Sequence, residues 1–331
     1  MDNHIRCFDD IVSQIFDSEN VATDTLVDQV KVEKVILKLF NEFEMKASVD
    51  PNLPKLNKNA HTRLLTKWLK NLPQSYECLD ASRPWIVYWI LHALWILNSL
   101  PDKRILSDVV KFLSHCQHEE GGYGGGPGQH PHLGTTYAAV NALSIIGTDE
   151  AYDSIDRSSL QKFLWSVKEV DGSFALHKGG EQDIRGAYCA ISVAKLTNTY
   201  TDMLFDKTAE WIVSCQTYEG GFGGCPDNKK LIDTVLFNQG ALQEYIMICC
   251  QAPDGGLIDK PGKPRDIYHT CYTLSGLSIA QHGTGAGDPY VVGTPRNELN
   301  RVHPLHNVAP HLVYNAIHYF IRHPPPVKDK N

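Results

Sequence analysis

Hydrophobic and polar positions in the middle of the chain follow two alternating helical patterns. Three segments mix charged with bulky apolar residues, as a helix with one wet face does: 111–113, 160–164 and 209–212. Three others carry small residues on nearly every face, which suits a helix packed on both sides: 137–143, 188–194 and 271–277. The alternation predicts helical hairpins, each with one outer and one inner helix.

A glycine turn recurs between these predicted helices. Three segments share the pattern Cys-Gln-x-x-acid-Gly-Gly, and Asp171-Gly172 is a degenerate further copy. The acidic residues of the four copies are separated by 51, 48 and 35 positions: Glu120, Asp171, Glu219 and Asp254. A period of this size indicates a repeat architecture. Its unit is an inner helix, a turn, an outer helix and a glycine loop.

The predicted fold class is all-α. Strand signals are nearly absent between Asn59 and Gln281, and the helix stops Gly147 and Asn198 fall between predicted helices. Such hairpins form an open solenoid or close into an α/α barrel, and the period alone does not choose between them. We predict an N-terminal helical extension (1–58), the barrel repeats (59–283), and a C-terminal segment (284–331) that packs on the barrel and ends in a disordered tail.

Composition narrows the functional classes. The 331 residues are 42% apolar, enough for a large core, and the net charge of −7 without a basic block argues against nucleic-acid binding. The nine cysteines form no C-x-x-C array, which indicates a reducing, cytoplasmic compartment. The first ten residues lack a signal-peptide h-region, and the apolar run Trp85–Leu97 is too short to cross a bilayer. We therefore expect a soluble protein without membrane insertion.

Four motifs resemble the β subunits of protein farnesyltransferases, over about residues 30–326: Ala81–His92, Gly121–Gln129, Gly180–Cys189 and Asp259–Tyr272. Ala241–Tyr245 and the region around Asp259 are more similar to the farnesyl branch than to the geranylgeranyl ones. The resemblance implies an α/α barrel (toroid) with a central funnel, an α-subunit partner, one zinc ion and magnesium for the diphosphate. It also implies transfer of a farnesyl group from farnesyl diphosphate to the cysteine of a C-terminal Cys-a-a-X motif.

The same resemblance assigns site residues. It makes Asp233 and His269 zinc ligands and gives Lys230 and Tyr268 catalytic roles at the diphosphate. It also assigns substrate binding to six residues: Trp85, Trp89, Arg185, Tyr188, Lys230 and Tyr268. Without it, the tryptophans are ordinary core aromatics, His269 is a hydrogen-bonded core residue and Asp233 caps a helix.

The repeat register gives an independent argument for one shared site. Asp233 lies fourteen residues after Glu219, and Arg185 and Tyr268 lie equally far after the acidic residues of their own repeats. Equal positions in a repeat lie at the same rim of a barrel. We therefore expect Arg185, Asp233 and Tyr268 at one rim, with His269 beside them.

One repeat departs from the family pattern. Tyr188 and Cys215 are 27 positions apart, whereas the equivalent Leu236 and Cys250 are only 14 apart, so about one helix is missing around residues 229–233. Val235 stands where the family has a zinc-binding cysteine, and a valine side chain cannot bind a metal. Asp227 stands where the family has an arginine. The substitutes for the lost ligand are Cys225 and Cys271, although the register favours a packing role for Cys271.

Three hypotheses remain open at this stage. The first is an active farnesyltransferase β subunit that accommodates the shortened repeat. The second is a non-catalytic shortened isoform that binds the α subunit without turnover. The third is a barrel used only as an interaction module. One firmly bound zinc ion per chain would support the first hypothesis. A chain that binds no zinc would support the second or the third.

Overall fold

The computed structural model describes residues 23–216, 222–226, 237–283 and 287–324. In these ranges it contains helices and isolated β-bridges but no β-strand, which confirms the all-α class. None of the described helices is long and apolar enough to span a bilayer. The described residues form two compact units, one of residues 23–68, 93–99, 237–283 and 287–302 and one of residues 69–92, 100–216, 222–226 and 303–324. The domain boundaries expected at residues 58/59 and 283/284 stay predictions.

The first unit contains α2 (Asp24–Ala47), most of α3 (Lys58–Lys70), the end of α4, α11 (Gln239–Cys249), α12 (Ile267–His282) and the short η2 (Pro295–Asn297). Helix α11 packs against α12 and α2. The buried Asn297 ties the early chain to the late chain, because its side chain donates to the Pro54 carbonyl at 2.7 Å and accepts from the Leu56 amide at 3.0 Å.

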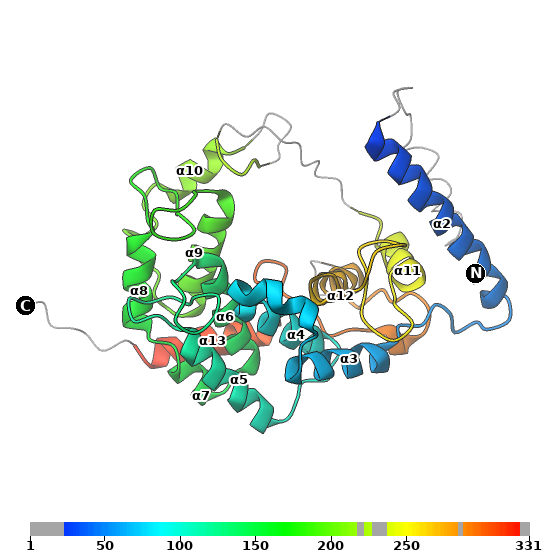
Figure 1. Cartoon of the computed structure of the whole chain (residues 1–331), viewed down its shortest axis with the longest axis horizontal. Coiled ribbons are helices and arrows are strands. Elements are labelled where there is room, and N and C mark those ends of the chain that lie inside the picture. The colour runs from blue at the N-terminus through cyan, green and yellow to red at the C-terminus, as the bar shows by residue number, and fades with distance from the viewer. Residues whose placement is uncertain (1–22, 217–221, 227–236, 284–286, 325–331) are drawn as a thin grey trace, which may run out of the picture. The chain divides into compact units, whose positions relative to one another are not determined.

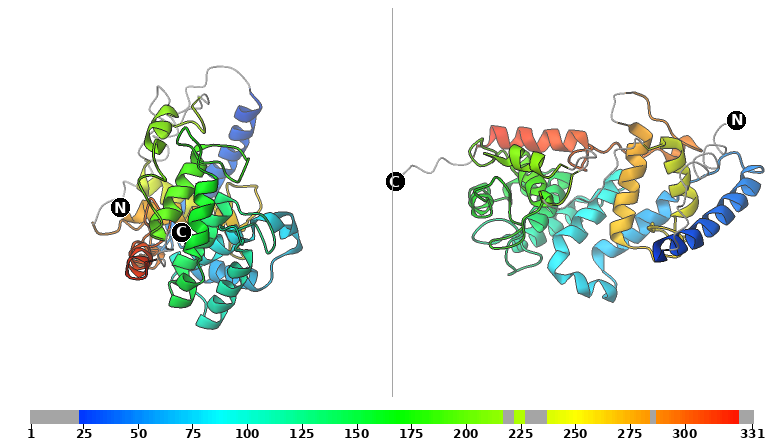
Figure 2. Two further views of the ribbon diagram at one scale, coloured as in Figure 1. Left: turned by 90° about the vertical axis from the view of Figure 1, so that its left-hand side faces the viewer. Right: turned by 90° about the horizontal axis from the view of Figure 1, so that it is seen from above.

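The second unit contains the larger set of helices (Figure 1). They are η1 (Gln74–Ser82), α4 (Arg83–Ile96) as far as His92, α5 (Lys103–Cys116), α6 (Leu133–Ile146), α7 (Asp149–Asp153), α8 (Arg157–Ser166), α9 (Ile184–Leu196), α10 (Thr208–Ser214) and α13 (Pro310–Arg322). Helices α6 and α9 lie side by side, and α13, red in Figure 2, packs on both of them and on α7.

The helices bury the faces that the sequence pattern predicts. All residues of α6 are buried, as expected for an inner helix, whereas α5 buries one stripe along a single face: Leu106, Val109, Val110, Leu113 and Cys116. The predicted helix stops are also confirmed. Gly147 ends α6 with a φ of 67°, and Asn198 follows α9 with a φ of 53°, both in the left-handed region.

The repeated glycine turn has a steric cause. Gly121, Gly172 and Gly255 have φ values of 95°, 101° and 94°, which L side chains rarely adopt. A Cβ atom on these glycines would lie 1.8, 2.2 and 2.2 Å from backbone carbonyl oxygens at the start of another helix: Ser159, Lys207 and Ala60, respectively. Each glycine loop therefore packs directly on a helix start, and only glycine fits there.

The register of the repeat is visible in the helix caps. His132, Asp183 and Asp266 each lie twelve residues after the acidic residue of their repeat. They cap α6, α9 and α12, respectively, by accepting a backbone hydrogen bond of 2.7–2.9 Å from the first turn. Arg185 and Tyr268 are consequently the second residues of their inner helices, at equal positions. Asp233, the third member of the predicted rim, lies outside the described residues.

Candidate functional site

Four aromatic side chains of the second unit form a continuous row, called the aromatic row below: Trp85, Trp89, Tyr137 and Tyr188. Trp85 stacks on Trp89 with ring centroids 5.6 Å apart, and Tyr137 lies 5.6 Å from Trp85 and 5.4 Å from Tyr188. The row crosses α4, α6 and α9. Three of its members are predicted site residues. Tyr137 was missed, although it follows Glu120 by the same 17 positions that separate Tyr188 from Asp171.

Exposure varies among the members of the aromatic row. Tyr137 is 4% exposed and Tyr188 is 42% exposed, whereas Trp85 and Trp89 are half-buried. The hydroxyl oxygens of these two tyrosines are 3.2 Å apart. Burial raises the pKa of Tyr188 and outweighs the opposing hydrogen bond with Tyr137, so the phenol stays neutral and can donate a hydrogen bond. Rings arranged in this way offer an apolar surface to a hydrocarbon chain.

Arg185 places a fixed positive charge one turn before Tyr188. Its Nε atom lies 3.0 Å from both Asp183 carboxylate oxygens, and Nη2 is 2.5 Å from Oδ2. Burial acts to raise the pKa of Asp183, but hydrogen bonds from Arg185 outweigh it and lower that pKa. The guanidinium is thus oriented at the start of α9 while its side chain remains 70% exposed. It can bind an anionic group there.

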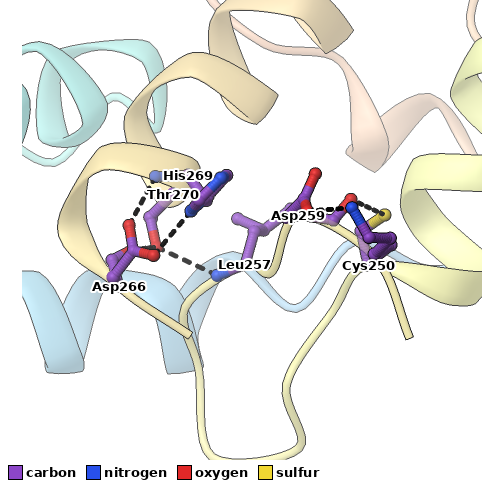
Figure 3. A network of polar contacts seen from close by, with 7 residues as sticks. Cys250, Leu257, Asp259, Asp266, His269 and Thr270 are labelled. Carbon is purple, nitrogen blue, oxygen red and sulfur yellow. Dashed lines mark hydrogen bonds and ion pairs between the residues drawn. The ribbon is translucent and has the colours of Figure 1, made fainter. Parts of the chain in front are cut away.

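The predicted metal ligand His269 lies in the first unit, in the first turn of α12 (Figure 3). Asp266 accepts a hydrogen bond from the His269 amide at 2.7 Å, and its second carboxylate oxygen lies 2.5 Å from Nδ1. Because a carboxylate only accepts hydrogen bonds, Nδ1 is the donor in this contact, and Nε2 is the ring nitrogen that the contact does not use. A single carboxylate therefore caps the helix and orients the imidazole.

The Thr270 side chain holds the glycine loop of this repeat against α12. The Thr270 hydroxyl donates to the Asp266 carbonyl at 2.6 Å and accepts from the Leu257 amide at 2.9 Å (Figure 3). The bond from the loop recurs in the second unit, where the Thr136 hydroxyl accepts from the Tyr123 amide at 2.9 Å and the neighbouring Thr135 hydroxyl donates to the carbonyl of the capping residue His132 at 3.1 Å. The loop that carries Asp259 is thus fixed relative to His269.

Tyr268 and two carboxylates surround His269. The Tyr268 ring is 49% exposed and meets the imidazole edge-on, with centroids 5.2 Å apart. The Lys260 ammonium lowers the pKa of Asp259, and the His269 ring lowers it further. Sequence reasoning did not select Asp259 or Asp266 as site residues. The position of Asp266, three residues before His269 at a predicted inner-helix start, was the available signal.

The described residues do not complete a zinc site. A catalytic zinc ion takes three protein ligands, and no cluster of three His, Cys, Asp or Glu side chains suited to a metal occurs among the described residues. Cys271 is fully buried and burial raises the pKa of its thiol, which fits the packing role expected from the register. Cys225 is partly exposed in the second unit. Four residues predicted to bear on the zinc and diphosphate sites lie outside the described ranges: Asp227, Lys230, Asp233 and Val235.

Comparison with known proteins identifies one family. A family model of the prenyltransferase alpha-alpha toroid domain matches residues 56–231 and 228–308. The β subunit of protein farnesyltransferase from Arabidopsis thaliana is 30% identical, over 89% of each chain. The corresponding subunit from Saccharomyces cerevisiae is 31% identical, over 91% of this chain and 88% of its own. A solved Candida albicans protein geranylgeranyltransferase-I, complexed with GGPP, aligns at a TM-score of 0.42 and 18% identity over 81% of this chain and all of its own.

The comparisons also bear on the shortened repeat. The aligned stretch with the Arabidopsis subunit is 429 residues long, which exceeds the 331 residues of this chain. That subunit therefore contains residues with no counterpart here. The two matches to the toroid domain meet at residues 228–231, where the sequence pattern places the missing helix.

Proposed function

Because this chain belongs to the prenyltransferase alpha-alpha toroid family and, within it, to the farnesyltransferase β subunits, we propose that it serves as the β subunit of a protein farnesyltransferase. In this role it transfers a farnesyl group from farnesyl diphosphate to the cysteine of a C-terminal Cys-a-a-X motif. The partner is a farnesyltransferase α subunit, and the compartment is the cytoplasm, in keeping with the free cysteines among the described residues.

The observation that best supports the proposal is the pairing of the aromatic row with Arg185. Farnesyl diphosphate has a long apolar chain and a highly charged head. The row offers ring surfaces across three helices, and the exposed guanidinium lies one helical turn from Tyr188. The second unit thus contains an apolar surface next to a fixed cation, and these are the two features that this substrate requires.

Each residue has a distinct part in the proposed reaction. The sulfur of the peptide cysteine forms a bond to carbon one of the farnesyl chain while the bond from that carbon to the diphosphate oxygen breaks. Arg185, Lys230 and Tyr268 stabilise the negative charge that develops on the leaving diphosphate. Trp85, Trp89 and Tyr188 bind the apolar chain and hold it in place. Magnesium supplies further positive charge to the diphosphate when it is bound.

His269 and Asp233 are the proposed zinc ligands. The Asp266 carboxylate supports this role for His269, since a metal-binding histidine usually donates its other ring N–H to a carboxylate or carbonyl. Zinc would hold the peptide thiol as a thiolate at neutral pH. Val235 leaves the set one ligand short, and this deficit favours the alternative function of a non-catalytic shortened isoform that binds the α subunit without turnover.

Co-expression with an α subunit tests the proposal. We expect the partner to raise the soluble yield and to co-purify in equal amounts, and we expect the complex to bind farnesyl diphosphate, measured by quenching of tryptophan fluorescence. A chain that is fully folded alone and indifferent to the partner contradicts the proposed complex. A complex that forms but binds no prenyl diphosphate supports the non-catalytic alternative.

A further inference from the structure

A buried histidine holds the glycine loop that contains Gly255 and Gly256 against α3. The His61 ring of α3 is completely buried, and its Nδ1 atom accepts a hydrogen bond from the Gly256 amide at 2.8 Å. Its Nε2 atom lies 3.1 Å from the side-chain oxygen of Gln251, and an amide oxygen can only accept. Nε2 therefore carries the hydrogen, and the ring is the neutral Nε2–H tautomer.

The side chain of Gln251 has a fixed orientation. Its oxygen also accepts from the Asn57 amide at 2.8 Å, and its nitrogen donates to the carbonyls of Lys55 and Met247 at 2.9 and 2.7 Å. All the hydrogen-bonding capacity of this amide is used, so the amide cannot turn over without losing bonds. A protonated His61 ring would therefore point its second hydrogen at a backbone N–H. Only the neutral ring keeps both contacts.

A short path of hydrogen bonds leads from this contact to the start of α12 (Figure 3). Gly256 is followed by Leu257, whose amide donates to the Thr270 hydroxyl at 2.9 Å. The same hydroxyl donates to the Asp266 carbonyl at 2.6 Å, and Asp266 both caps α12 and orients the His269 ring. All of these residues belong to the first unit. The placement of the His269 ring therefore depends on how firmly the loop is held at Gly256.

We propose that His61 is a positioning residue for the start of α12, that it acts through Leu257 and Thr270, and that only its neutral form does so. The inference rests on the proposed function in one respect, because that function makes His269 a zinc ligand whose orientation matters. A ring that is already oriented loses less conformational freedom when it binds a metal.

Acid is expected to release the contact between His61 and the loop. Burial lowers the pKa of His61, and the hydrogen bond with Gln251 opposes this shift. The unfolded chain therefore takes up the proton at a higher pH than the folded chain does. The stability that the contact provides is consequently lost as the pH falls below about 6.5. None of the charged side chains on the neighbouring segments contributes to the shift: Lys58 on α3, Glu244 on α11, and Asp254 and Arg265 on the loop.

Two substitutions separate the roles of the two ring nitrogens. Asparagine places its side-chain oxygen near the position of Nδ1 and can still accept from Gly256, whereas glutamine reaches the position of Nε2 and cannot. Hydrogen–deuterium exchange of the full chain is measured for residues 255–258 and 266–270. At about pH 7.5 we expect exchange in both ranges to be about fivefold faster in His61→Gln than in the parent, the effect of one lost hydrogen bond. His61→Asn should match the parent.

The pH profile gives a readout that a merely structural role would not change. At about pH 5, with rates corrected for the intrinsic effect of pH on exchange, we expect the parent to exchange faster than His61→Asn in both ranges. The reason is that the parent's imidazole takes up a proton and loses its acceptor, whereas the asparagine side chain does not titrate. Parent and His61→Asn should therefore agree near neutral pH and separate in acid.

Two further variants test the path and the specificity of the effect. Thr270→Val removes the hydroxyl that links the loop to α12. Compared with Thr270→Val alone, adding His61→Gln should still speed exchange at 255–258 but no longer at 266–270. His118→Asn is the matched control, because Nδ1 of His118 accepts the Glu120 amide at 3.2 Å in a glycine loop of the second unit. It should leave exchange in both ranges unchanged at either pH.

The outcomes separate the inference from the proposed function. Zinc binding by the same samples, measured by competition with a chelating dye, tests the proposed metal site. A chain that binds no zinc counts against that site, and the exchange data still decide the role of His61. Unchanged exchange of residues 266–270 in His61→Gln overturns the positioning role. A parent that exchanges like His61→Asn at acid pH overturns the requirement for the neutral ring.

Discussion

Single glycines limit which residues the repeat tolerates. Gly121 combines a positive φ with a backbone oxygen 1.8 Å from where its Cβ atom would lie, so a side chain meets both backbone strain and a clash. A backbone oxygen at a helix start cannot move aside as a flexible side chain can. The two effects therefore add at this position.

We expect Gly121→Ala to reduce the free energy of unfolding by about 3 kcal/mol or more. Gly128→Ala is the matched control, because Gly128 also has a positive φ of 75° but has no atom within 4 Å of the added Cβ. That control should cost about 1 kcal/mol, from backbone strain alone. Urea unfolding measures both, and equal losses in the two variants would show that the close contact is unimportant.

Asp266 combines two roles that a pair of substitutions can separate. Asparagine retains an oxygen that can accept the helix-capping hydrogen bond, whereas alanine removes it. We expect Asp266→Ala to lower the free energy of unfolding by about 1 kcal/mol and Asp266→Asn by only a few tenths. Asp183→Ala and Asp183→Asn provide the comparison at the same repeat position. Equal losses for Asp266→Ala and Asp266→Asn would mean that the charge, rather than the cap, stabilises α12.

At the scale of elements, α11 places the carboxyl group of Glu244 on a buried face, where burial destabilises its charged form. Glu244 is 8% exposed, and burial raises its pKa to about 7. Helices α12 and α2 pack against α11. The folded state therefore keeps this carboxyl protonated over a pH range in which the unfolded chain has already released the proton.

The raised pKa of Glu244 fixes the direction in which its contribution to folding stability changes with pH. Between about pH 4.5 and pH 7 the folded state binds more protons at Glu244 than the unfolded state does, so its contribution to stability falls as the pH rises. We expect Glu244→Gln to match the parent near pH 4 and to be more stable at pH 8 by on the order of 2 kcal/mol. Chemical unfolding at both pH values measures the difference. The exposed Glu44→Gln of α2 should show no such trend, and a parent whose stability at pH 8 equals that of Glu244→Gln would contradict the prediction.

For the whole molecule, the proposed function makes the activity depend on the shortened repeat. Under that proposal, Val235 stands where a zinc-binding cysteine is expected, and Asp227 stands where an arginine is expected at the diphosphate. A metal site with a missing ligand has lower affinity, and each donor lost from the transition state typically costs about 100-fold or more in rate.

We therefore expect little farnesyl transfer from the chain as it stands, even with an α subunit, zinc and magnesium. The measurement is turnover on a dansylated Cys-a-a-X peptide, together with the zinc content of the dialysed complex. A chain with the missing repeat restored and Val235→Cys should recover both. Val235→Ala in the same restored chain is the control and should recover neither. Ordinary turnover by the unaltered chain would show that another residue, with Cys225 the first to test, completes the metal site.

The sequence by itself determined the properties that depend on neighbours in the chain. Helix periodicity and the glycine register predicted the all-α class, the inner and outer helices, and the equal positions of Arg185 and Tyr268. They did so because burial of one helix face, a positive φ and a helix cap are local requirements that leave a local pattern. Trp85, Trp89 and Tyr188 were predicted as site residues from the resemblance to a family rather than from the register.

Only the tertiary structure decided which distant segments meet. Gly255 packs on the Ala60 carbonyl, and the Gly256 amide donates to His61 at 2.8 Å across 195 positions of sequence. The Tyr88 hydroxyl donates to the Asn307 carbonyl across 219 positions. Such contacts leave no periodic signal, because a buried hydroxyl or imidazole needs some partner but its own sequence neighbourhood does not specify which one. Long-range pairing therefore joined the early and late helices.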